Sequence, residues 1–429
     1  MLRPHIVILG AGFGGVYVAK KLAPLVKRGD IDVTIINRSN SFLFTPLLHE
    51  VATGGLSPRI VAESLREVFV GTNIRIIQGV GDSINSGKRT ITVRNGFAEI
   101  TLSYDYLVVA TGAETNYYGI PGAQEYALPL KSMPDARMIR NRVIDAFERA
   151  VICEDPVERK MLLSFVVVGG GATGVELAAE LAEFVSGMIE RYYGKTHCRT
   201  DDRRRCSPEE ASITVVNAAH ELLEQFKPRL REAALYRLEH HGIVVKQDMA
   251  VTSVTKDSIT MVPTGKTEPK EALPASIIIW TAGVKASIPR FEDITPVLVR
   301  GRIAVEDTMI MPGADKIFAM GDAAATKDPS PQLAQVAEAQ ADTVASNLIR
   351  SIKGKPLKTF TFRSKGSMVS VGQWFAIGEI FSMNIAGRIT WWMWRTVYLF
   401  KFASWKKRIR IAFDWTFEIF FPRDITKSS

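Results

Sequence analysis

The stretch that decides the fold is His5-Ile6-Val7-Ile8-Leu9-Gly10-Ala11-Gly12-Phe13-Gly14-Gly15. An apolar run ends at a glycine and continues as G-x-G-x-x-G through Gly10, Gly12 and Gly15. The run predicts a buried parallel strand. Gly10 permits a tight turn, Gly12 lets backbone N–H groups approach a pyrophosphate, and Gly15 lets the next helix pack close to the strand. One such motif is a weak signal, because glycine-rich turns are common.

The same motif occurs a second time. The apolar run 165–168 leads into G-x-G-x-x-G at Gly169, Gly171 and Gly174, and a helical pattern follows. A strand before the glycines and a helix after them are the context that a dinucleotide-binding turn requires. Two such turns in one chain predict two bound dinucleotides.

The partner strand of each turn ends in asparagine. Asn37 and Asn217 stand where Asp or Glu commonly binds a ribose 2′-hydroxyl. An amide still bonds a hydroxyl, although less strongly than a carboxylate does. The missing carboxylate at Asn217 leaves NADPH open as the second nucleotide, but no arginine follows at once to bind a 2′-phosphate. NADH is therefore favoured.

Two further apolar segments end in turns that we expect to face the first cofactor. The segment 106–112 ends in Ala110-Thr111-Gly112, which resembles the turn that returns the chain across the cofactor in flavoproteins with two dinucleotides. The segment 316–324 contains Gly321-Asp322 before an expected helix. The Asp322 carboxylate suits a ribityl hydroxyl and the helix N-terminus suits a pyrophosphate. The alternative role of Asp322 is a helix N-cap.

Bulk composition limits the remaining possibilities. The chain has 429 residues, 46% hydrophobic and 23% charged, which predicts a globular protein of two or three domains. Three cysteines give no even disulfide framework and favour a reducing compartment. The net charge of +9 suits either nucleic acid or an anionic membrane. The position of the cations decides between these two partners.

The C-terminal segment differs from the rest of the chain. Its aromatic and apolar residues step by three or four and predict one narrow helical face: Trp391, Trp394, Tyr398, Phe402, Trp405 and Ile409. The opposite side is also apolar, and cations crowd its end: Lys401, Lys406, Lys407, Arg408 and Arg410. No window of eighteen uncharged apolar residues exists, so a spanning helix is not expected. We expect a helix in the interface of an anionic membrane, and no nucleic-acid partner.

The loop 192–210 carries the only plausible metal ligands. His197, Cys198 and Cys206 lie in it, but their spacing matches no C-x-x-C pattern and a fourth ligand is not evident. A solvated insertion is the favoured interpretation, and no metal is expected.

Together the motifs resemble the type II NADH:quinone oxidoreductases, the single-subunit, non-proton-pumping NADH dehydrogenases. The resemblance covers nearly the whole chain. It rests on segments 42–48, 51–56, 110–116, 130–132, 169–176, 280–284 and 321–322, and on the Trp-rich tail, which binds the membrane in this family. The resemblance implies FAD on an outer domain, NAD(P)H on an inserted one, and hydride transfer to the flavin followed by two-electron reduction of a quinone.

The resemblance also implies contact residues. For FAD they are Gly10, Gly12, Phe13, Gly14, Gly15, Asn37, Arg38, Thr45, Pro46, Val80, Ala110, Thr111, Gly112, Gly321, Asp322, Ala334 and Gln335. For NAD(P)H they are Gly169, Gly171, Thr173, Gly174, Glu176, Asn217, Ala282 and Gly283.

Three residues are implied as catalytic: Glu176, Gln335 and Gln340. Gln335 and Gln340 match the family's A-Q-x-A-x-Q-Q-G motif, in which Ala339 and Ala341 here replace a glutamine and a glycine. That departure leaves the quinone headgroup preference open. Glu176 is either a contact to the nicotinamide end with a part in proton delivery, or a first-turn carboxylate stabilised by the helix dipole. For His49 and Glu50 a polar surface role is favoured over catalysis.

The expected fold class is α/β, with two Rossmann-like dinucleotide-binding domains, one inserted in the other, and a C-terminal helical membrane-associating region. The expected segments are 1–130 and 276–350 for FAD, 131–275 for NAD(P)H, and 351–429 for the membrane region, with lipid contact through residues 385–421. We expect a peripheral protein on the cytoplasmic face of the cell membrane, or on the mitochondrial inner membrane if eukaryotic. The sequence allows a homodimer.

Three alternative functions share this fold. A sulfide:quinone oxidoreductase needs a cysteine well toward the C-terminus, and none follows Cys206. A ferredoxin-type reductase would leave the aromatic tail without a role. A redox-sensing flavoprotein that binds a protein partner is the alternative outside enzymes, and quinone-dependent turnover separates it from an oxidoreductase.

Overall fold

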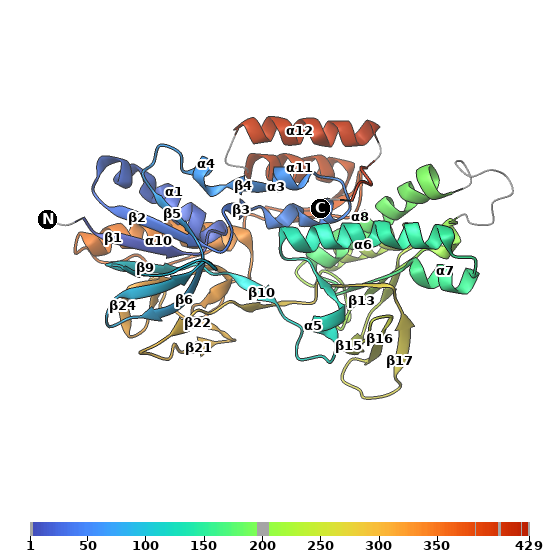
Figure 1. The fold of residues 1–429 in the computed structure, drawn as a ribbon, viewed down its shortest axis with the longest axis horizontal. Coiled ribbons are helices and arrows are strands. Elements are labelled where there is room, and N and C mark those ends of the chain that lie inside the picture. The colour runs from blue at the N-terminus through green and yellow to red at the C-terminus, as the bar shows by residue number, and fades with distance from the viewer. Residues whose placement is uncertain (1–2, 195–205, 382, 402–404, 422, 428–429) are drawn as a thin grey trace. The chain divides into compact units, whose positions relative to one another are not determined.

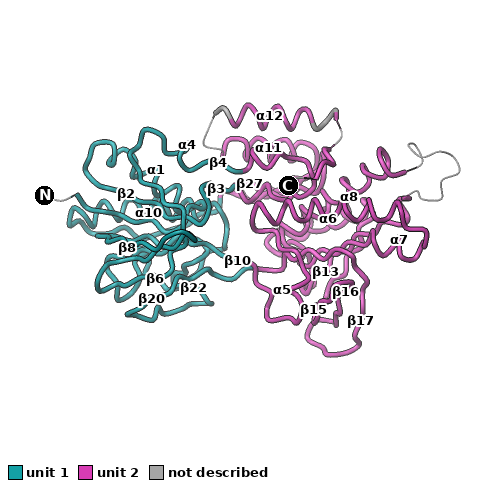
Figure 2. The backbone as a smooth tube through the Cα atoms, viewed as in Figure 1, with its two compact units in different colours: residues 1–43, 62–114, 284–364 teal, residues 44–61, 115–283, 365–429 magenta. Residues whose placement is uncertain are grey.

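The structure is a computed structural model. It describes residues 3–194, 206–381, 383–401, 405–421 and 423–427. Two compact α/β units make up the chain (Figure 2). Unit 1 comprises residues 1–43, 62–114 and 284–364, and unit 2 comprises residues 44–61, 115–283 and 365–429. These bounds differ from the expected cofactor domains, whose limits stay a prediction.

Unit 1 is built on a six-stranded sheet in the order β23-β24-β9-β1-β2-β5. Its four central strands pair in parallel, with Ile8 of β1 opposite Ile35 of β2 and Val108 of β9. Helices α1 and α10 pack against each other beside this sheet (Figure 1). The bounds are β1 His5–Leu9, α1 Phe13–Arg28, β2 Asp32–Asn37, β5 Arg75–Gln78, β9 Tyr106–Val109, β23 Ile310–Met311, β24 Ala314–Ala319 and α10 Ala334–Ile352.

Smaller elements complete unit 1. They are β3 Ser41–Leu43, β4 Ala62–Ser64, α4 Leu65–Val68, β6 Val80–Asn85, β7 Thr90–Arg94, β8 Glu99–Ser103, β10 Ala113–Thr115, β19 Val284–Ala286, β20 Arg290–Phe291, β21 Leu298–Val299, β22 Arg302–Ala304, the 3₁₀ turn η4 Gly321–Ala323 and β25 Ala324–Ala325. Strands β6, β7 and β8 form an antiparallel sheet that β20 joins.

Unit 2 repeats the parallel arrangement in a five-stranded sheet, β11-β18-β12-β13-β14. A separate antiparallel sheet, β15-β16-β17, packs its apolar face into the same core. The bounds are α5 Ala123–Tyr126, β11 Leu128–Pro129, α6 Met133–Ile152, α7 Pro156–Leu162, β12 Ser164–Val168, α8 Ala172–Met188, the π-helical turn η2 Ile189–Tyr193, the 3₁₀ turn η3 Pro208–Glu210, β13 Ser212–Val216, α9 Pro228–His240, β14 Val244–Lys246, β15 Met249–Val254, β16 Ser258–Pro263, β17 Glu271–Pro274 and β18 Ile277–Trp280.

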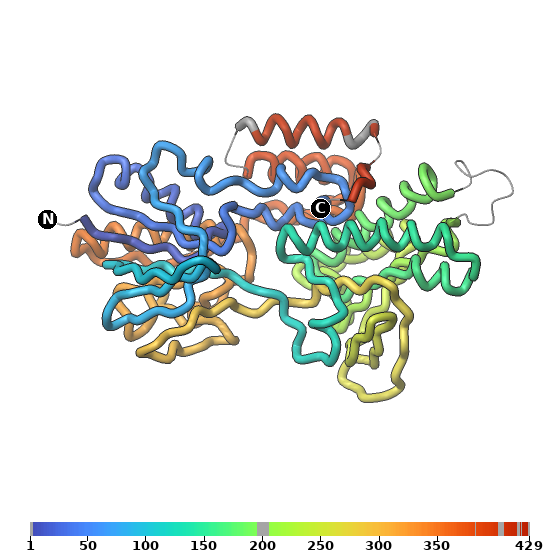
Figure 3. Tube along the Cα trace, in the orientation of Figure 1, coloured from blue at the N-terminus to red at the C-terminus, as the bar shows by residue number. Residues whose placement is uncertain are grey.

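Two distant pieces of chain complete unit 2. The first contains the 3₁₀ turn η1 Thr45–Leu47, α2 Leu48–Ala52 and α3 Pro58–Val61; the second contains β26 Ser367–Ser370, β27 Ala376–Ile380, β28 Met383–Gly387, α11 Arg388–Lys401 and α12 Trp405–Phe420. In Figure 3 the blue α2–α3 segment runs alongside the red C-terminal helices, and α12 contacts α3.

The tail corrects one prediction. The aromatic stripe was expected on one helix, but the structure has two helices, α11 and α12, with residues 402–404 between them outside the described residues. Trp391 and Trp394 are buried, whereas Ile409 is 62% exposed. The stripe therefore does not form one helical face, because its residues are divided between two helices. No helix among the described residues is both long and apolar enough to cross a membrane.

Candidate functional site

The glycine turn of unit 1 is closed on one side and open on the other. Gly10 has φ +102°, and a Cβ there would meet the Ala110 carbonyl carbon at 2.7 Å. A Cβ on Gly15 would meet the carbonyl oxygen of Gly10. Gly12, the N-cap of α1, has no neighbour within 4 Å of such a Cβ. The backbone is thus packed tightly behind and left accessible at the helix N-terminus, which suits a pyrophosphate.

The glycine turn of unit 2 has the same form. Gly169 has φ +115°, and a Cβ there would lie 2.8 Å from the Ala282 nitrogen. A Cβ on Gly174 would meet the carbonyl oxygen of Gly169, and Gly171 is open like Gly12. Ala110–Thr111 and Ala282, predicted from sequence at the ends of apolar strands, are therefore brought against the glycine turns of their own units.

The two asparagines hold these turns from behind. Asn37 Oδ1 accepts a hydrogen bond from Ala11 N at 2.9 Å, and Asn37 Nδ2 donates to Ser39 O at 2.9 Å. Asn37 Nδ2 also donates weakly to Ser41 O at 3.4 Å. We expected the Asn37 amide to bond the adenosine ribose, but the backbone already occupies its donors.

Asn217 makes the same set of contacts in unit 2. Its Oδ1 accepts from Gly170 N at 3.0 Å, and its Nδ2 donates to Ala219 O at 3.0 Å and Glu221 O at 2.9 Å. Asn217 is 9% exposed. Each amide thus braces its own turn, and its contact with a ribose hydroxyl stays a prediction.

The Gly-Asp turn of unit 1 differs from expectation in its helix. Gly321 and Asp322 lie in the short 3₁₀ turn η4, and the next long helix, α10, begins only at Ala334. The prediction of a helix directly after Gly321-Asp322 is therefore wrong. The turn still adjoins the first glycine motif, because a Cβ on Gly14 would lie 2.7 Å from Met320 Cε.

Gln340 supports this turn. Its Oε1 accepts a hydrogen bond from Gly321 N at 2.7 Å, and the side chain is 4% exposed. Gln335 and Ala334, at the start of α10, are half-buried. The observed role of Gln340 is to hold the turn, and its contact with a substrate stays a prediction.

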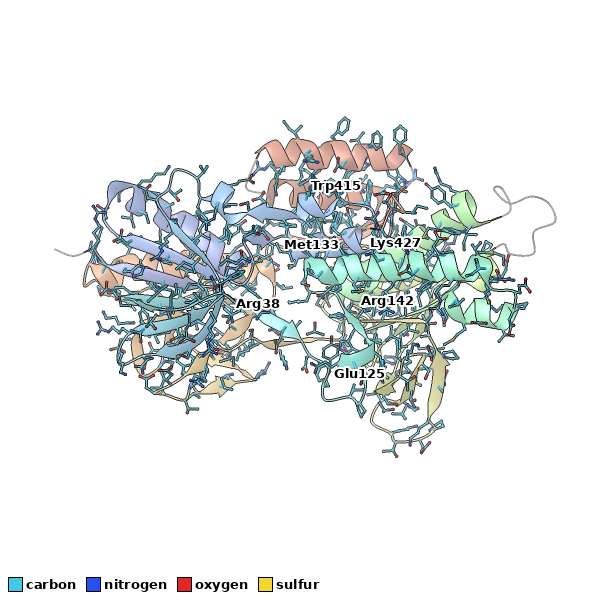
Figure 4. The ribbon with its side chains drawn as sticks, viewed as in Figure 1. Arg38, Glu125, Met133, Arg142, Trp415 and Lys427 are labelled. Carbon is cyan, nitrogen blue, oxygen red and sulfur yellow. The ribbon has the colours of Figure 1, made fainter. Side chains whose placement is uncertain are left out.

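The remaining expected contact residues fall in both units. In unit 1, Phe13 packs edge-on against Phe42 at 5.2 Å between ring centroids, exposed Arg38 follows β2 (Figure 4), and Val80 begins β6. In unit 2, Thr45 and Pro46 form η1, Thr173 is exposed in the first turn of α8, and Gly283 is exposed.

Glu176 is the fifth residue of α8 and lies just past the first turn of the helix. Helix α8 begins at Ala172 and has no acidic residue in its first turn, so the helix-dipole explanation of Glu176 is wrong. The carboxylate is 7% exposed, and Ser370 N donates to its Oε1 at 3.2 Å. Burial raises the pKa of Glu176 well above its usual value, more than the Ser370 N–H lowers it. Glu176 therefore holds its proton more tightly than an exposed glutamate does.

His49 and Glu50 correct a second prediction. They were expected on the surface, but all of α2 is buried, with His49 2% and Glu50 3% exposed. His49 Nδ1 lies 3.7 Å from Glu176 Oε2, and Trp415 Nε1 donates to Glu50 Oε2 at 2.9 Å. The apolar neighbours in Leu47-Leu48-His49-Glu50-Val51-Ala52 were the sequence signal that these two polar residues lie inside.

Burial controls the protonation of this pair. It lowers the pKa of His49 to about 4, with a smaller contribution from Arg423, so the ring is neutral at pH 7. It raises the pKa of Glu50 to about 7, against the opposing pull of Arg395. The charge near Glu176 thus depends on pH close to neutrality.

Sequence reasoning also missed two glutamates further along α8. Glu180 and Glu183 follow Glu176 at intervals of four and three residues, so the three share one helix face. Arg423 Nη2 is ion-paired with Glu180 and lies 3.3 Å from Glu183 Oε2. Although burial opposes it, Arg423 holds the pKa of Glu180 below its usual range. Burial, with Glu180 nearby, raises the pKa of Glu183 to about 7.

The C-terminal helices present one aromatic face inward and another outward. Trp394 contacts Tyr398 and Trp415, and the guanidinium of Arg395 lies between the Trp391 and Trp415 rings, 3.9 and 4.9 Å from their centroids. Trp415 lies on the side of α12 that faces α11 (Figure 4). The outward residues are at least 37% exposed: Ile389, Trp392, Met393, Val397, Phe400, Ile409, Phe413, Phe417 and Phe421.

The expected metal candidates are only partly described. His197 and Cys198 lie outside the described residues, and Cys206 is buried. Within the described ranges no three His, Cys, Asp or Glu side chains are grouped to hold an ion.

Comparison with known proteins identifies the family. Residues 4–341 match the model of the pyridine nucleotide-disulphide oxidoreductases, and residues 364–424 match the NDH2 C-terminal domain. The type II NADH:quinone oxidoreductase NdhA of Mycobacterium tuberculosis is 31% identical over 96% of this chain and 86% of its own length. The chain belongs to the type II NADH:quinone oxidoreductases.

Solved structures of this fold agree with that membership. NDH2 from Plasmodium falciparum, in complex with NADH, superposes with a TM-score of 0.90 over 99% of this chain and all of that one, at 22% identity. The sulfide:quinone oxidoreductase of Aquifex aeolicus gives 0.74 over 99% of this chain and 96% of that one, at 19% identity. At these identities the likeness concerns the fold alone, and family membership rests on the sequence matches.

Proposed function

We propose that this chain oxidises NADH and transfers two electrons to a membrane quinone without pumping protons, with FAD bound by unit 1 and NADH by unit 2. The observation that carries the proposal is the pair of glycine turns, each closed behind by a braced backbone and open at a helix N-terminus. Membership of the type II NADH:quinone oxidoreductases supports it. NADPH remains an alternative donor.

Unit 1 fits the diphosphate and ribityl parts of FAD. Gly12 N–H and the following amides at the start of α1 would bind the pyrophosphate, and the Asp322 carboxylate a ribityl hydroxyl. Gln340 would hold Gly321 in place, and Gln335 would lie toward the isoalloxazine edge. Bound FAD supplies the redox chemistry, by accepting a hydride from the nicotinamide and giving two electrons to the quinone.

Unit 2 fits NADH in the same way. The amides after Gly171 would bind its pyrophosphate, and Ala282–Gly283 would border the nucleotide at the end of β18. Glu176, two residues after Gly174, would face the nicotinamide end. Because burial raises its pKa well above the usual value, this carboxyl group is suited to hold a proton and donate it.

The outward face of α11 and α12 would bind an anionic membrane. Trp392 is 50%, Phe400 63% and Phe413 67% exposed, which is unusual for large apolar side chains gathered on two neighbouring helices. Lys401 ends α11 and Arg408 lies near the start of α12. Both cations would bind lipid phosphates. Such a contact makes the protein peripheral.

The test is steady-state turnover of the purified, FAD-loaded protein. We expect NADH oxidation with short-chain quinones, and slower oxidation of NADPH. If neither nucleotide is oxidised with any quinone while a protein partner binds in a redox-dependent manner, the oxidoreductase assignment is wrong. Membrane binding is tested separately by vesicle sedimentation of the Phe413→Ser, Phe417→Ser double variant, which we expect to stay in solution.

A further inference from the structure

Helix α8 carries a buried row of carboxylates that leads away from the nucleotide turn. Glu176, Glu180 and Glu183 lie on one face, over about 10 Å at 1.5 Å per residue. Carboxylates at i, i+4 and i+7 repel one another when all are ionised. Such a row persists in a protein interior only when some of its members are protonated or paired.

Basic side chains lie beside each member of the row. His49 Nδ1 lies 3.7 Å from Glu176 Oε2 at one end, and His241 Nε2 lies 3.8 Å from Glu183 Oε1 at the other. Arg423 bridges Glu180 and Glu183 in the middle. Among the described atoms, His49 Nε2 and His241 Nε2 are buried without a hydrogen-bond partner. Both imidazoles therefore have an unused ring nitrogen.

A cavity of about 350 Å³ lies at the C-terminal end of the row. Glu183, Arg237, Trp374 and Arg423 line it, and the exposed Arg191 and Glu190 stand at its rim. At about 30 Å³ per water molecule, this volume holds on the order of ten waters. The charged groups in its lining suit bound water, which would give Glu183 access to solvent protons.

Gly372 keeps the junction between the cavity and the row open. A Cβ there would collide with Glu183 Oε1 and lie 3.1 Å from His241 Nε2. Its φ of +81° also favours glycine. The next residue, Gln373, donates its backbone N–H to Glu183 Oε1. The loop thus fixes Glu183 beside His241 without filling the space between them.

The proposed reaction requires an incoming proton. NADH gives a hydride, which carries two electrons and one proton, while reduction of a quinone to a quinol takes two electrons and two protons. The balance is NADH + quinone + H⁺ → NAD⁺ + quinol. One proton per turnover must come from solvent, and Glu176 is itself buried.

We infer that this row is a proton-uptake path within unit 2, running from the cavity through Glu183, His241, Glu180 and His49 to Glu176. The inference rests on the proposed function and extends it to residues to which no role has been assigned. A proton bound at Glu183 passes along the row, His49 transfers it to Glu176, and Glu176 gives it up and is reprotonated in turn.

The charges around the path suit this direction of transfer. Glu183 faces Glu180 on its own helix, Arg237 and His241 from α9 and its C-cap, and Arg423 from the C-terminal segment. Burial raises the pKa of Glu183 to about 7 and the pKa of Glu176 well above its usual value. The middle groups release protons readily, since Arg423 keeps Glu180 ionised and burial keeps His49 neutral. The two ends of the row therefore bind a proton more tightly than the groups in its middle do.

The experiment measures hydrogen–deuterium exchange at Glu176 by infrared spectroscopy of the purified holoenzyme. The carboxylic acid band of Glu176 is assigned by its absence in Glu176→Gln. We expect the band to shift rapidly on transfer of the wild type to D₂O, and at least tenfold more slowly in Glu183→Gln. The control is Glu190→Gln, which removes the same charge from the rim of the same cavity and should exchange like the wild type.

Turnover provides a second readout. We expect Glu183→Gln to lower the quinone kcat about tenfold, with a larger solvent isotope effect and an unchanged KM for NADH. Oxidation of NADH by ferricyanide, which takes electrons without protons, should be unaffected. If Glu183→Gln does not fold, His241→Gln, which leaves the Arg423 pairs intact, is expected to slow the exchange.

The outcomes separate this inference from the proposed function. Equal exchange in the wild type, Glu183→Gln and His241→Gln would overturn the uptake path even if quinone reduction is normal. Slowed exchange would support the path even if the acceptor proved not to be a quinone, because the infrared band reports on the protein alone. Equal slowing by Glu190→Gln would also contradict the inference, since that residue is outside the row.

Discussion

The two glycine turns share one backbone geometry and differ in the helices that follow. Gly12 and Gly171 have φ of −76° and −75°, and each is the open N-cap of its helix. Gly10 N donates to Ile36 O and Gly169 N to Val216 O, both at 2.8 Å. A phosphate-binding turn of this kind is therefore specified by local sequence, independently of which cofactor it serves.

The helices diverge at matching positions. Counted from the third glycine, Glu176, Glu180 and Glu183 of α8 correspond to Tyr17, Lys21 and Pro24 of α1. Lys21 makes an exposed pair with Asp342, whereas Glu180 is 9% exposed in its side chain and pairs with Arg423. The two turns thus share one backbone form, whereas only the helix of unit 2 has a row of buried carboxylates at these positions.

The largest expected effect comes from breaking the buried pair. Arg423→Gln leaves Glu180 and Glu183 without their shared cation, and we expect a loss of about 3–5 kcal/mol in the free energy of unfolding. Lys21→Gln, at the α1 position that matches Glu180, should lose less than about 1 kcal/mol because its pair is exposed. Denaturant unfolding measures both. Similar losses of unfolding free energy in the two variants would show that the ion pair on α8 contributes no more to stability than the ion pair on α1.

The next effect is a pH dependence confined to unit 2. The folded-state pKa of Glu50, about 7, lies above its unfolded value, so this group stabilises the fold below pH 4.5 and its contribution is lost as pH rises through 7. Glu50→Gln removes that loss and keeps an acceptor for Trp415. As the pH rises from 4.5 to 8, we expect the free energy of unfolding of the variant to increase by on the order of 2–3 kcal/mol relative to that of the wild type. A pH-independent difference would contradict the buried assignment.

The two asparagines should behave alike in stability and differently in binding. Asn217→Ala and Asn37→Ala each remove several hydrogen bonds that hold a glycine turn. We expect each variant to lose about 2 kcal/mol in the free energy of unfolding. Asn217→Ala should raise the KM for NADH, and Asn37→Ala should weaken FAD retention. Asn217→Glu should impair NADH and NADPH use together. Selective loss of NADPH would instead show that the side chain contacts the ribose.

The smallest effect on stability is expected on the outward face of α12. Phe413→Ser and Phe417→Ser should each change the unfolding free energy by less than about 0.5 kcal/mol, because both rings are exposed. Trp415→Ser, on the inward face, should be strongly destabilising, since it also deprives Glu50 of its donor. Thermal melts compare the three. Deleting the tail is a poorer test of membrane binding, because Arg395 and Arg423 would be lost with it.

The elements that sequence predicted best are those specified by neighbouring residues. Four consecutive apolar residues precede Gly10 and Gly169, and the first and third glycine of each motif have no room for a side chain. Both strands and both helices lie where the motif predicts them. The role of the asparagines was not predictable, because a side chain that bonds a ribose and one that bonds its own turn share the same position.

The buried charges were missed because their partners are distant in the chain. Glu50 and Trp415 are 365 positions apart, and Arg423 meets Glu180 across 243 positions. His49 and Glu50 were predicted at the surface because none of their partners is close to them in the sequence. The prediction for the C-terminal segment failed for a related reason. Helical periodicity identifies residues that share a face, but it does not show whether that face packs against the rest of the protein or is exposed.

The most direct test of two turns serving two cofactors is flavin content and flavin reduction in Gly171→Val. The wild type should carry one FAD per chain and be bleached by NADH. Because Gly171 belongs only to the turn of unit 2, we expect Gly171→Val to keep its full flavin and to require at least tenfold more NADH for bleaching. A folded Gly171→Val protein that loses its flavin, or that is bleached at wild-type NADH concentrations, would contradict the assignment of the two turns.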